Sequence, residues 1–156
     1  MAEKRILLMR HAEKPEQSDN PHLSAIGQAR AQALTKRIAG ILKSPLDFIF
    51  AAKPSAHSVR PLLTVTPLAH SAQLKVDDNF VDTDYGELAN QLSSDSIYTD
   101  KNIVVCWHHD MIPDFAKALG APVPSMFVSK WPPTEFDRIY SFEYGDFPSP
   151  RTTAIN

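Results

Sequence analysis

The sequence predicts an α/β fold, a three-layer sandwich in which helices cover both faces of a mostly parallel sheet. Two observations lead to this prediction. Short, continuous apolar runs of four or five residues alternate with longer segments whose apolar residues recur at helical spacing. Near the C-terminus, polar and apolar residues instead alternate, which is typical of a strand with one exposed face. We therefore expect an antiparallel edge strand beside the parallel ones.

The chain has 156 residues, of which 43% are hydrophobic and 22% are charged, the balance of an ordinary soluble domain. A chain of this length buries a sizeable core without cross-links, so we interpret residues 1–156 as a single domain. Its 16 Lys and Arg residues against 18 Asp and Glu residues give a formal net charge of −2. This balance argues against nucleic acid as a partner, and any anion site must be local.

The N-terminal region and the cysteine content bear on location. An apolar run at residues 6–9 follows a basic start, but it is too short for a signal peptide or a membrane span. We interpret it as the first strand and expect no membrane association. The single cysteine, Cys106, has no intrachain disulfide partner, which favours a cytoplasmic location.

The remaining elements follow from local patterns. Two further inner strands are predicted at residues 48–51 and 103–107, and a helix from Ala25 to about Leu42 with Ser24 as its N-cap. Less regular segments predict a helix near 58–70 interrupted by two prolines, a short strand near 74–76 and one or two helical turns at 88–92. Further along the chain we expect a helix from 112 that ends at Gly120, an edge strand at 138–143 and a loosely held tail from Gly145.

Polar side chains follow the inner strands, at the sheet edge where open α/β sheets bind ligands. Arg10 and His11 come directly after the first strand, and His108 comes after the last. Arg60 lies just inside the helix that follows the second strand. Guanidinium groups match the geometry of phosphate oxygens, and imidazole serves as nucleophile or proton donor near neutral pH. These four side chains therefore predict a phosphate pocket.

Four segments then allow a comparison with known sequences. They are residues 7–14 (LLMRHAEK), 23–29 (LSAIGQA), 60–64 (RPLLT) and 104–113 (VVCWHHDMIP). In this order they resemble the histidine phosphatase superfamily, which includes phosphoglycerate mutase-like phosphatases and small phosphohistidine phosphatases. The resemblance extends over about residues 5–120 and implies a phosphoglycerate mutase-like fold.

The resemblance also implies a mechanism that uses neither cofactor nor metal. His11 would attack phosphorus and become phosphohistidine, while Arg10, Arg60 and His108 hold the phosphoryl oxygens and water then cleaves the intermediate. His108 is preferred to His109 because the family's second histidine stands four residues before the Ile of an Ile-Pro pair, here Ile112. The substrate would be a phosphorylated small molecule or a phosphohistidine protein.

The implied site also includes a proton donor for the leaving group. The family often places an acid shortly before a Tyr-Gly pair, here Tyr85 and Gly86, which makes Asp82 and Asp84 the candidates. Asp82 is favoured because the mutase-like pattern puts the acid three residues before that Tyr. The alternative is that both aspartates are loop residues, since small phosphohistidine phosphatases can lack this acid.

Several departures leave other functions open. Ala12 stands where the family has Gly, Val65 follows the family's Thr, and Ala51 and Ala52 replace a polar pair. A phosphate-binding regulatory protein with little turnover is therefore the alternative. A mutase is less favoured because little sequence separates Gly86 from the last inner strand. Adjacent Glu13 and Lys14 are interpreted as a solvated charge pair, with contact to a substrate as the alternative.

Spacing argues against two other chemistries. A cysteine phosphatase needs an arginine six residues after its nucleophile, and the residue six after Cys106 is Ile112. A metal site at residues 108–110 is disfavoured because adjacent side chains on an extended chain diverge.

Overall fold

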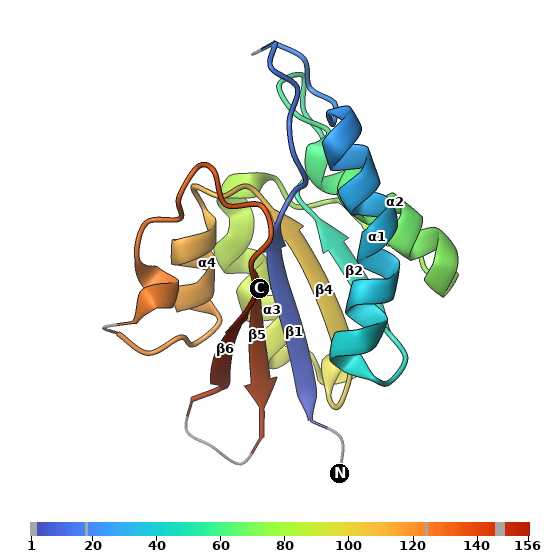
Figure 1. Ribbon diagram of the computed structural model, residues 1–156. Helices are drawn as coiled ribbons and strands as arrows, with labels where there is room; N and C mark the ends of the chain where they lie inside the picture. The colour runs from blue at the N-terminus through green and yellow to red at the C-terminus, as the bar shows by residue number, and fades with distance from the viewer. Residues whose placement is uncertain (1–2, 18, 124, 146–148) are drawn as a thin grey trace.

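The computed structural model describes residues 3–17, 19–123, 125–145 and 149–156, which form helices on either side of a sheet (Figure 1). In this part of the chain six strands pair in the order β3-β2-β4-β1-β5-β6. Their bounds are β1 Lys4–Arg10, β2 Phe48–Ala51, β3 Val76–Asp77, β4 Asn102–Trp107, β5 Ile139–Tyr144 and β6 Arg151–Ile155. Strands β1 to β4 are parallel, whereas β5 and β6 are antiparallel to their neighbours.

The helices divide between the two faces of the sheet. They are α1 Ala25–Leu42, α2 Arg60–Ala72, α3 Tyr85–Ser94 and α4 Ile112–Ala118. Helices α1 and α2 pack together against one face, through a core that includes Leu7 and Met9 of β1. Helices α3 and α4 cover the other face, where Ile6 and Leu8 of the same strand are buried. Alternate side chains of β1 thus enter opposite cores, and the predicted three-layer α/β fold is confirmed.

The antiparallel end of the sheet differs from the prediction. Strand β5, expected at the edge, lies between β1 and β6, and Ile139 to Phe142 are all buried. The alternating pattern misled because Ser141 is fully buried with a partner, since its hydroxyl accepts a hydrogen bond from Nε of Arg5 at 3.0 Å. The edge strand is β6, within the segment expected to be a loose tail; residues 146–148 of that segment lie outside the described residues.

The prolines of α2 do not interrupt it as expected. Pro61 lies in the first turn, where its missing N–H has no intrahelical partner to lose, and Pro67 lies inside a helix that continues to Ala72. Helix α3 is also longer than predicted, with 10 residues. The prediction for α1 is confirmed with its N-cap, since the Ser24 hydroxyl accepts a hydrogen bond from the backbone N–H of Gly27.

The sheet register brings the ends of three strands together. Arg10 pairs with Trp107 of β4, and Ala51 of β2 pairs with Cys106. The backbone N–H of His11 continues the ladder by donating to the Trp107 carbonyl at 3.1 Å. Side chains that follow β1, β2 and β4 therefore share one edge of the sheet.

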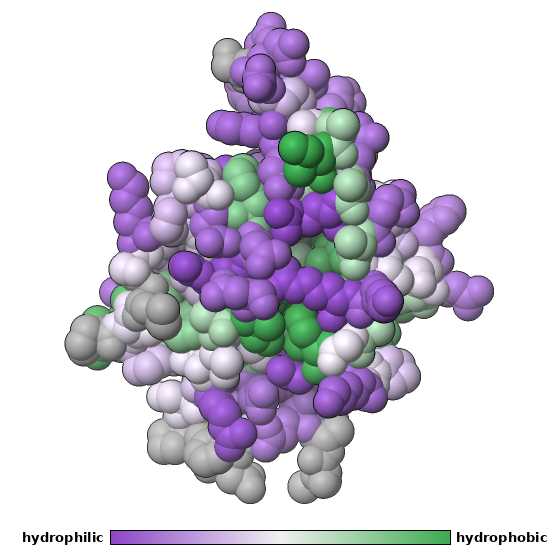
Figure 2. Space-filling model, in the orientation of Figure 1, coloured by the Kyte–Doolittle hydropathy of each residue, from purple (hydrophilic) through white to green (hydrophobic). Residues whose placement is uncertain are grey.

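The surface on the side shown in Figure 1 is mostly hydrophilic, with smaller apolar areas between (Figure 2). Among the described residues, we find no helix with the length and apolar character that a membrane crossing requires.

Candidate active site

His11 lies directly after β1 and is only 3% exposed. Its Nδ1 is 2.7 Å from the carbonyl oxygen of Ala12. Because a carbonyl only accepts hydrogen bonds, Nδ1 carries the proton and Nε2 keeps its lone pair. Burial, helped by the charges of Arg10, His108 and Arg60, lowers the pKa of His11 to about 3, although the Ala12 contact acts in the opposite direction. His11 is therefore a neutral imidazole with a free nucleophilic nitrogen.

Arg10 is equally buried, at 3% exposed, and contacts the segment before β5. Its Nη1 donates to the carbonyl oxygen of Pro133 at 2.6 Å and is 3.4 Å from that of Glu135. Its guanidinium carbon lies 3.9 Å from the centre of the Phe136 ring. Burial, with a smaller effect from Arg60, lowers the pKa of Arg10 to about 10, so the side chain stays cationic at neutral pH.

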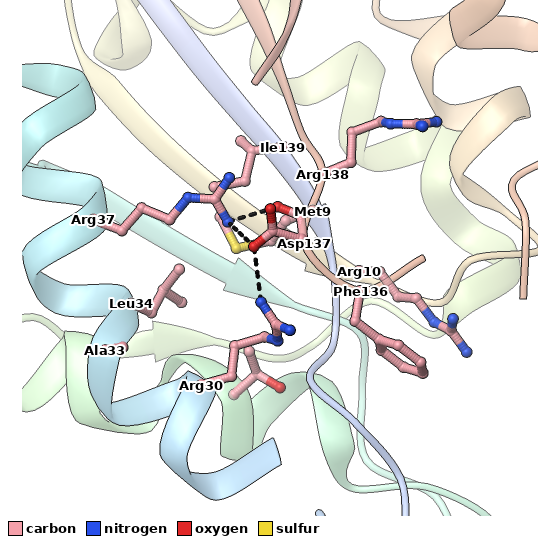
Figure 3. Close-up of a pocket in the computed structure, with 11 residues that line it drawn as sticks. Met9, Arg10, Arg30, Ala33, Leu34, Arg37, Phe136, Asp137, Arg138 and Ile139 are labelled. Atoms are coloured by element: carbon pink, nitrogen blue, oxygen red, sulfur yellow. Dashed lines mark hydrogen bonds and ion pairs between the residues drawn. The ribbon is translucent and has the colours of Figure 1, made fainter. Parts of the chain in front are cut away.

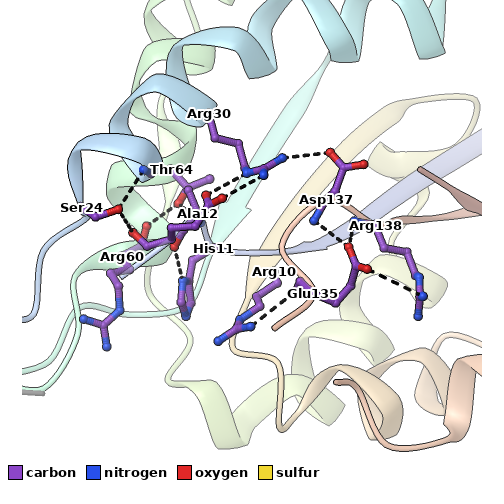
Figure 4. Close-up of polar contacts among 12 residues, drawn as sticks. Arg10, His11, Ala12, Ser24, Arg30, Arg60, Thr64, Glu135, Asp137 and Arg138 are labelled. Atoms are coloured by element: carbon purple, nitrogen blue, oxygen red, sulfur yellow. Dashed lines mark hydrogen bonds and ion pairs between the residues drawn. The ribbon is translucent and has the colours of Figure 1, made fainter. Parts of the chain in front are cut away.

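Arg60 begins α2, and its Nη1 donates to the carbonyl of Asn20 at 2.7 Å. The Nε atoms of Arg60 and Arg10 are both buried and have no hydrogen-bond partner among the described residues. Unpaired buried guanidinium N–H groups are costly, and an oxyanion between them would satisfy both. Figure 4 shows Arg60, His11 and Arg10 extending side by side in the same direction.

Thr64 connects α2 to the segment that carries His11. Its hydroxyl donates to the Arg60 carbonyl at 2.7 Å and accepts from the backbone N–H of Ala12 at 2.8 Å. Ala12 is buried but is not among the residues with positive φ, so an alanine fits where the family has Gly.

His108 faces His11 from the end of β4. The two ring centres are 5.4 Å apart with the planes at 69°. Burial lowers the pKa of His108, while the charges of Asp82 and Asp110 raise it. Of the neighbouring histidines, His108 is thus the one in ring contact with His11.

The two candidate acids occupy different positions. Asp82 begins a 3₁₀ turn, Asp82–Asp84, and its carbonyl accepts a hydrogen bond from Nε1 of Trp107 at 2.8 Å. Its charge acts on His108, whereas Asp84 lies at the N-cap position of α3. The structure therefore brings Arg10, His11, Arg60 and His108 together, with Asp82 beside His108.

Two features near the site were missed in the sequence. Glu13 does not form a solvated pair with Lys14; instead both its oxygens bind Arg30 of α1, each at 2.8 Å. The predicted pairing with Lys14 is wrong because Glu13 faces α1. Arg30 is 17 residues away in sequence, so no local pattern indicates this contact. Phe136 was also missed, since a single aromatic residue after two prolines carries no motif.

Across the described ranges, no group of three or more His, Cys, Asp and Glu side chains is arranged to hold a metal ion. Cys106 is fully buried within the sheet, and burial raises the pKa of its thiol.

No family model and no curated protein matches the sequence. Solved structures match over most of their length at low identity. One is the protein histidine phosphatase SixA with tungstate, with a TM-score of 0.66 and 13% identity over 96% of this chain and 94% of that chain. A second is a mycobacterial glucosyl-3-phosphoglycerate phosphatase with inorganic phosphate, with a TM-score of 0.65 and 16% identity over 98% of this chain and 96% of that chain. A third is phosphoglycerate mutase from Plasmodium falciparum, with a TM-score of 0.65 and 18% identity over 98% of this chain and 90% of that chain. The chain therefore has the α/β fold that these solved phosphatases and the phosphoglycerate mutase share.

Proposed function

We propose that the protein is a phosphatase that hydrolyses a phosphomonoester or a phosphohistidine through a phosphohistidine intermediate on His11. One observation carries the proposal. A buried, neutral imidazole stands between two arginines whose buried Nε groups lack partners in the described structure. Such an arrangement suits an anion whose phosphorus lies in front of a nucleophilic nitrogen.

The proposed reaction has two steps. In the first, Nε2 of His11 attacks phosphorus, the bond from phosphorus to the leaving group breaks, and the leaving oxygen or nitrogen takes a proton from Asp82. Arg10, Arg60 and His108 stabilise the charge on the phosphoryl oxygens in both steps. In the second step, water attacks phosphorus and gives a proton to Asp82, the P–N bond to His11 breaks, and inorganic phosphate leaves with His11 neutral and Asp82 protonated again.

The groups that this sequence of steps needs are side chains of the protein itself, so we propose that no cofactor takes part. The partner is then a phosphorylated small molecule or a phosphohistidine protein. A cytoplasmic location remains a prediction from the single cysteine.

One observation favours the alternative of a phosphate-binding regulatory protein. Nη1 of Arg10 is already bound to the Pro133 carbonyl, which leaves fewer of its donors for a substrate. Binding without turnover would follow if Arg10 were held in a position that suits the bound anion better than the transition state.

The test is to incubate the protein with an aryl phosphate and search for an acid-labile, base-stable phosphoprotein. His11→Ala should abolish this species and reduce turnover by at least about 10³-fold, because the nucleophile is lost. His109→Ala is the matched control and should retain both. Turnover that survives in His11→Ala would refute the mechanism, and vanadate binding without turnover in the wild-type protein would favour the regulatory alternative.

A further inference from the structure

A segment between α4 and β5, residues 131–138, crosses the sheet edge beside the phosphate pocket. We call it the strap. Three of its residues contact Arg10: the carbonyl oxygens of Pro133 and Glu135 face Nη1, and the Phe136 ring lies under the guanidinium group. The same ring is 6.2 Å from the ring of His11, centre to centre. The strap therefore meets both the proposed nucleophile and one of the groups that would hold its substrate.

These contacts fix the orientation of Arg10. The Phe136 ring packs against the flat face of the guanidinium group, and the carbonyl oxygens of Pro133 and Glu135 accept hydrogen bonds from its Nη1. Nε is left buried without a partner in the described structure. A long side chain that is held this way loses less conformational freedom when an anion binds.

The strap has its own internal support. The indole N–H of Trp131, which is 2% exposed, donates to the Glu135 carbonyl at 2.9 Å. The Glu135 carboxylate accepts from the backbone N–H groups of Asp137 and Arg138, at 2.8 and 3.0 Å. These bonds close a turn around Phe136, so its backbone position is defined before any ligand binds.

Asp137 anchors this turn to α1. Its Oδ1 is 2.9 Å from Nη1 of Arg30 and 3.3 Å from Nη1 of Arg37, so it lies between the two arginines (Figure 3). Arg30 also holds both carboxylate oxygens of Glu13, two residues after His11. One arginine thus connects the strap to the segment that carries the nucleophile.

A cavity next to Phe136 explains why the contacts of Asp137 with α1 matter for the position of the ring. A cavity of about 160 Å³ lies between the strap, β1 and α1, and Phe136, Asp137 and Arg10 all line it. Empty space beside a ring allows the ring to shift, unless the backbone that carries it is held. The link from Asp137 to Arg30 and Arg37 provides that restraint.

We propose that the strap is a positioning element for phosphate recognition, in which Phe136 and its anchor Asp137 act through Arg10. This inference rests on the proposed function for the identity of the anion, but it concerns how tightly the anion is bound. Phe136 is a positioning residue here: it orients Arg10 and takes no part in bond breaking.

The test measures the affinity for orthovanadate by calorimetry and the kinetic constants for an aryl phosphate. Phe136→Leu, which keeps an apolar side chain but removes the aromatic face, should weaken vanadate binding about tenfold and raise KM more than it lowers kcat. Phe136→Tyr should restore the affinity because its ring offers the same face. Thr134→Ala, at an exposed position of the strap, is the matched control and should bind as the wild type does.

Repeating Phe136→Leu in an Arg10→Ala background distinguishes a role that acts through Arg10 from a merely structural one. If Phe136 acts through Arg10, then Phe136→Leu has no further effect on vanadate affinity there. Asp137→Asn, at an exposed side chain, should weaken binding severalfold without loss of the folded state, as judged by the urea unfolding midpoint. It is a second probe if Phe136→Leu folds poorly.

The outcomes separate the two proposals. Unchanged vanadate affinity in Phe136→Leu, or an equal loss in the Arg10→Ala background, would overturn the role of the strap. Wild-type protein that binds vanadate without turnover would overturn the proposed function alone, because the affinity measurements still apply. Wild-type protein that does not bind vanadate would overturn both.

Discussion

At the scale of single residues, the position of Asp82 depends on a contact made by its backbone. The buried indole of Trp107 donates to the Asp82 carbonyl and thereby holds the turn beside His108. We predict that Asp82→Asn slows hydrolysis of an alkyl phosphate by about 10²-fold, because an alkoxide needs a proton as it leaves. Phosphohistidine hydrolysis should fall much less, since a phosphoramidate is more easily cleaved. Single-turnover rates on the two substrates measure the difference.

Asp84→Asn is the matched control, because Asp84 ends the same 3₁₀ turn at the N-cap position of α3 and is not among the charges that act on His108. It should leave both rates near those of the wild type. Equal slowing of both substrates by Asp82→Asn would show that Asp82 shapes the pocket and does not donate a proton.

At the scale of elements, the first turn of α1 packs closely against the backbone of the segment that follows His11. The Glu13 carbonyl accepts from the backbone N–H of Ser24 at 2.9 Å, and a Cβ at Gly27 would lie 2.3 Å from the same oxygen. We predict that Gly27→Ala lowers the free energy of unfolding by about 1–3 kcal/mol, because the backbone must move to admit the methyl group. Urea unfolding measures this, and phosphatase activity should fall as well.

Gly40 provides the control within the same helix. A Cβ there would meet nothing within 4 Å, so Gly40→Ala should be neutral or stabilise the fold by up to about 1 kcal/mol through helix propensity. Equal destabilisation by the two substitutions would contradict the proposed packing.

Elements that depend on local pattern were predictable, and those that depend on pairing were not. The helix at Ala25–Leu42 and the strand at Phe48–Ala51 have the predicted bounds, because periodicity and apolar runs are local signals. Whether β5 is an edge depends on β6, whose five residues (RTTAI) follow a segment with Pro and Ser and look like a tail by themselves. The buried Ser141 looks exposed until its partner Arg5, 136 residues away, is known.

The same distinction applies to the site. Arg10, His11 and His108 could be placed together because parallel strands end at one edge of a sheet. The contacts of Arg30 with Glu13 and Asp137 cross between elements 17 and 107 residues apart in sequence. Their geometry depends on the packing of α1 and the path of the strap, which no motif encodes.

At the scale of the whole molecule, the buried His11 and the half-buried His108 make the fold sensitive to acid. Burial lowers the pKa of His11 to about 3 and also lowers that of His108, whereas an unfolded histidine titrates near 6.5. The unfolded chain therefore binds more protons below about pH 6.5, and stability falls as pH decreases from there towards 3. For His11, the slope approaches about 1.4 kcal/mol per pH unit within this range.

We predict that the free energy of unfolding, measured with urea between pH 8 and pH 5, is level above about pH 7 and declines below it. This window lies above the range in which Glu13, whose pKa Arg30 lowers, takes up a proton. His11→Gln should reduce the slope, because a glutamine gains no proton on unfolding, whereas His22→Gln should retain it, since His22 is exposed in the folded chain. Identical slopes in the wild type and His11→Gln would mean that His11 already carries its proton in the folded protein. The buried imidazole would then lack the free lone pair on which the proposed attack at phosphorus depends.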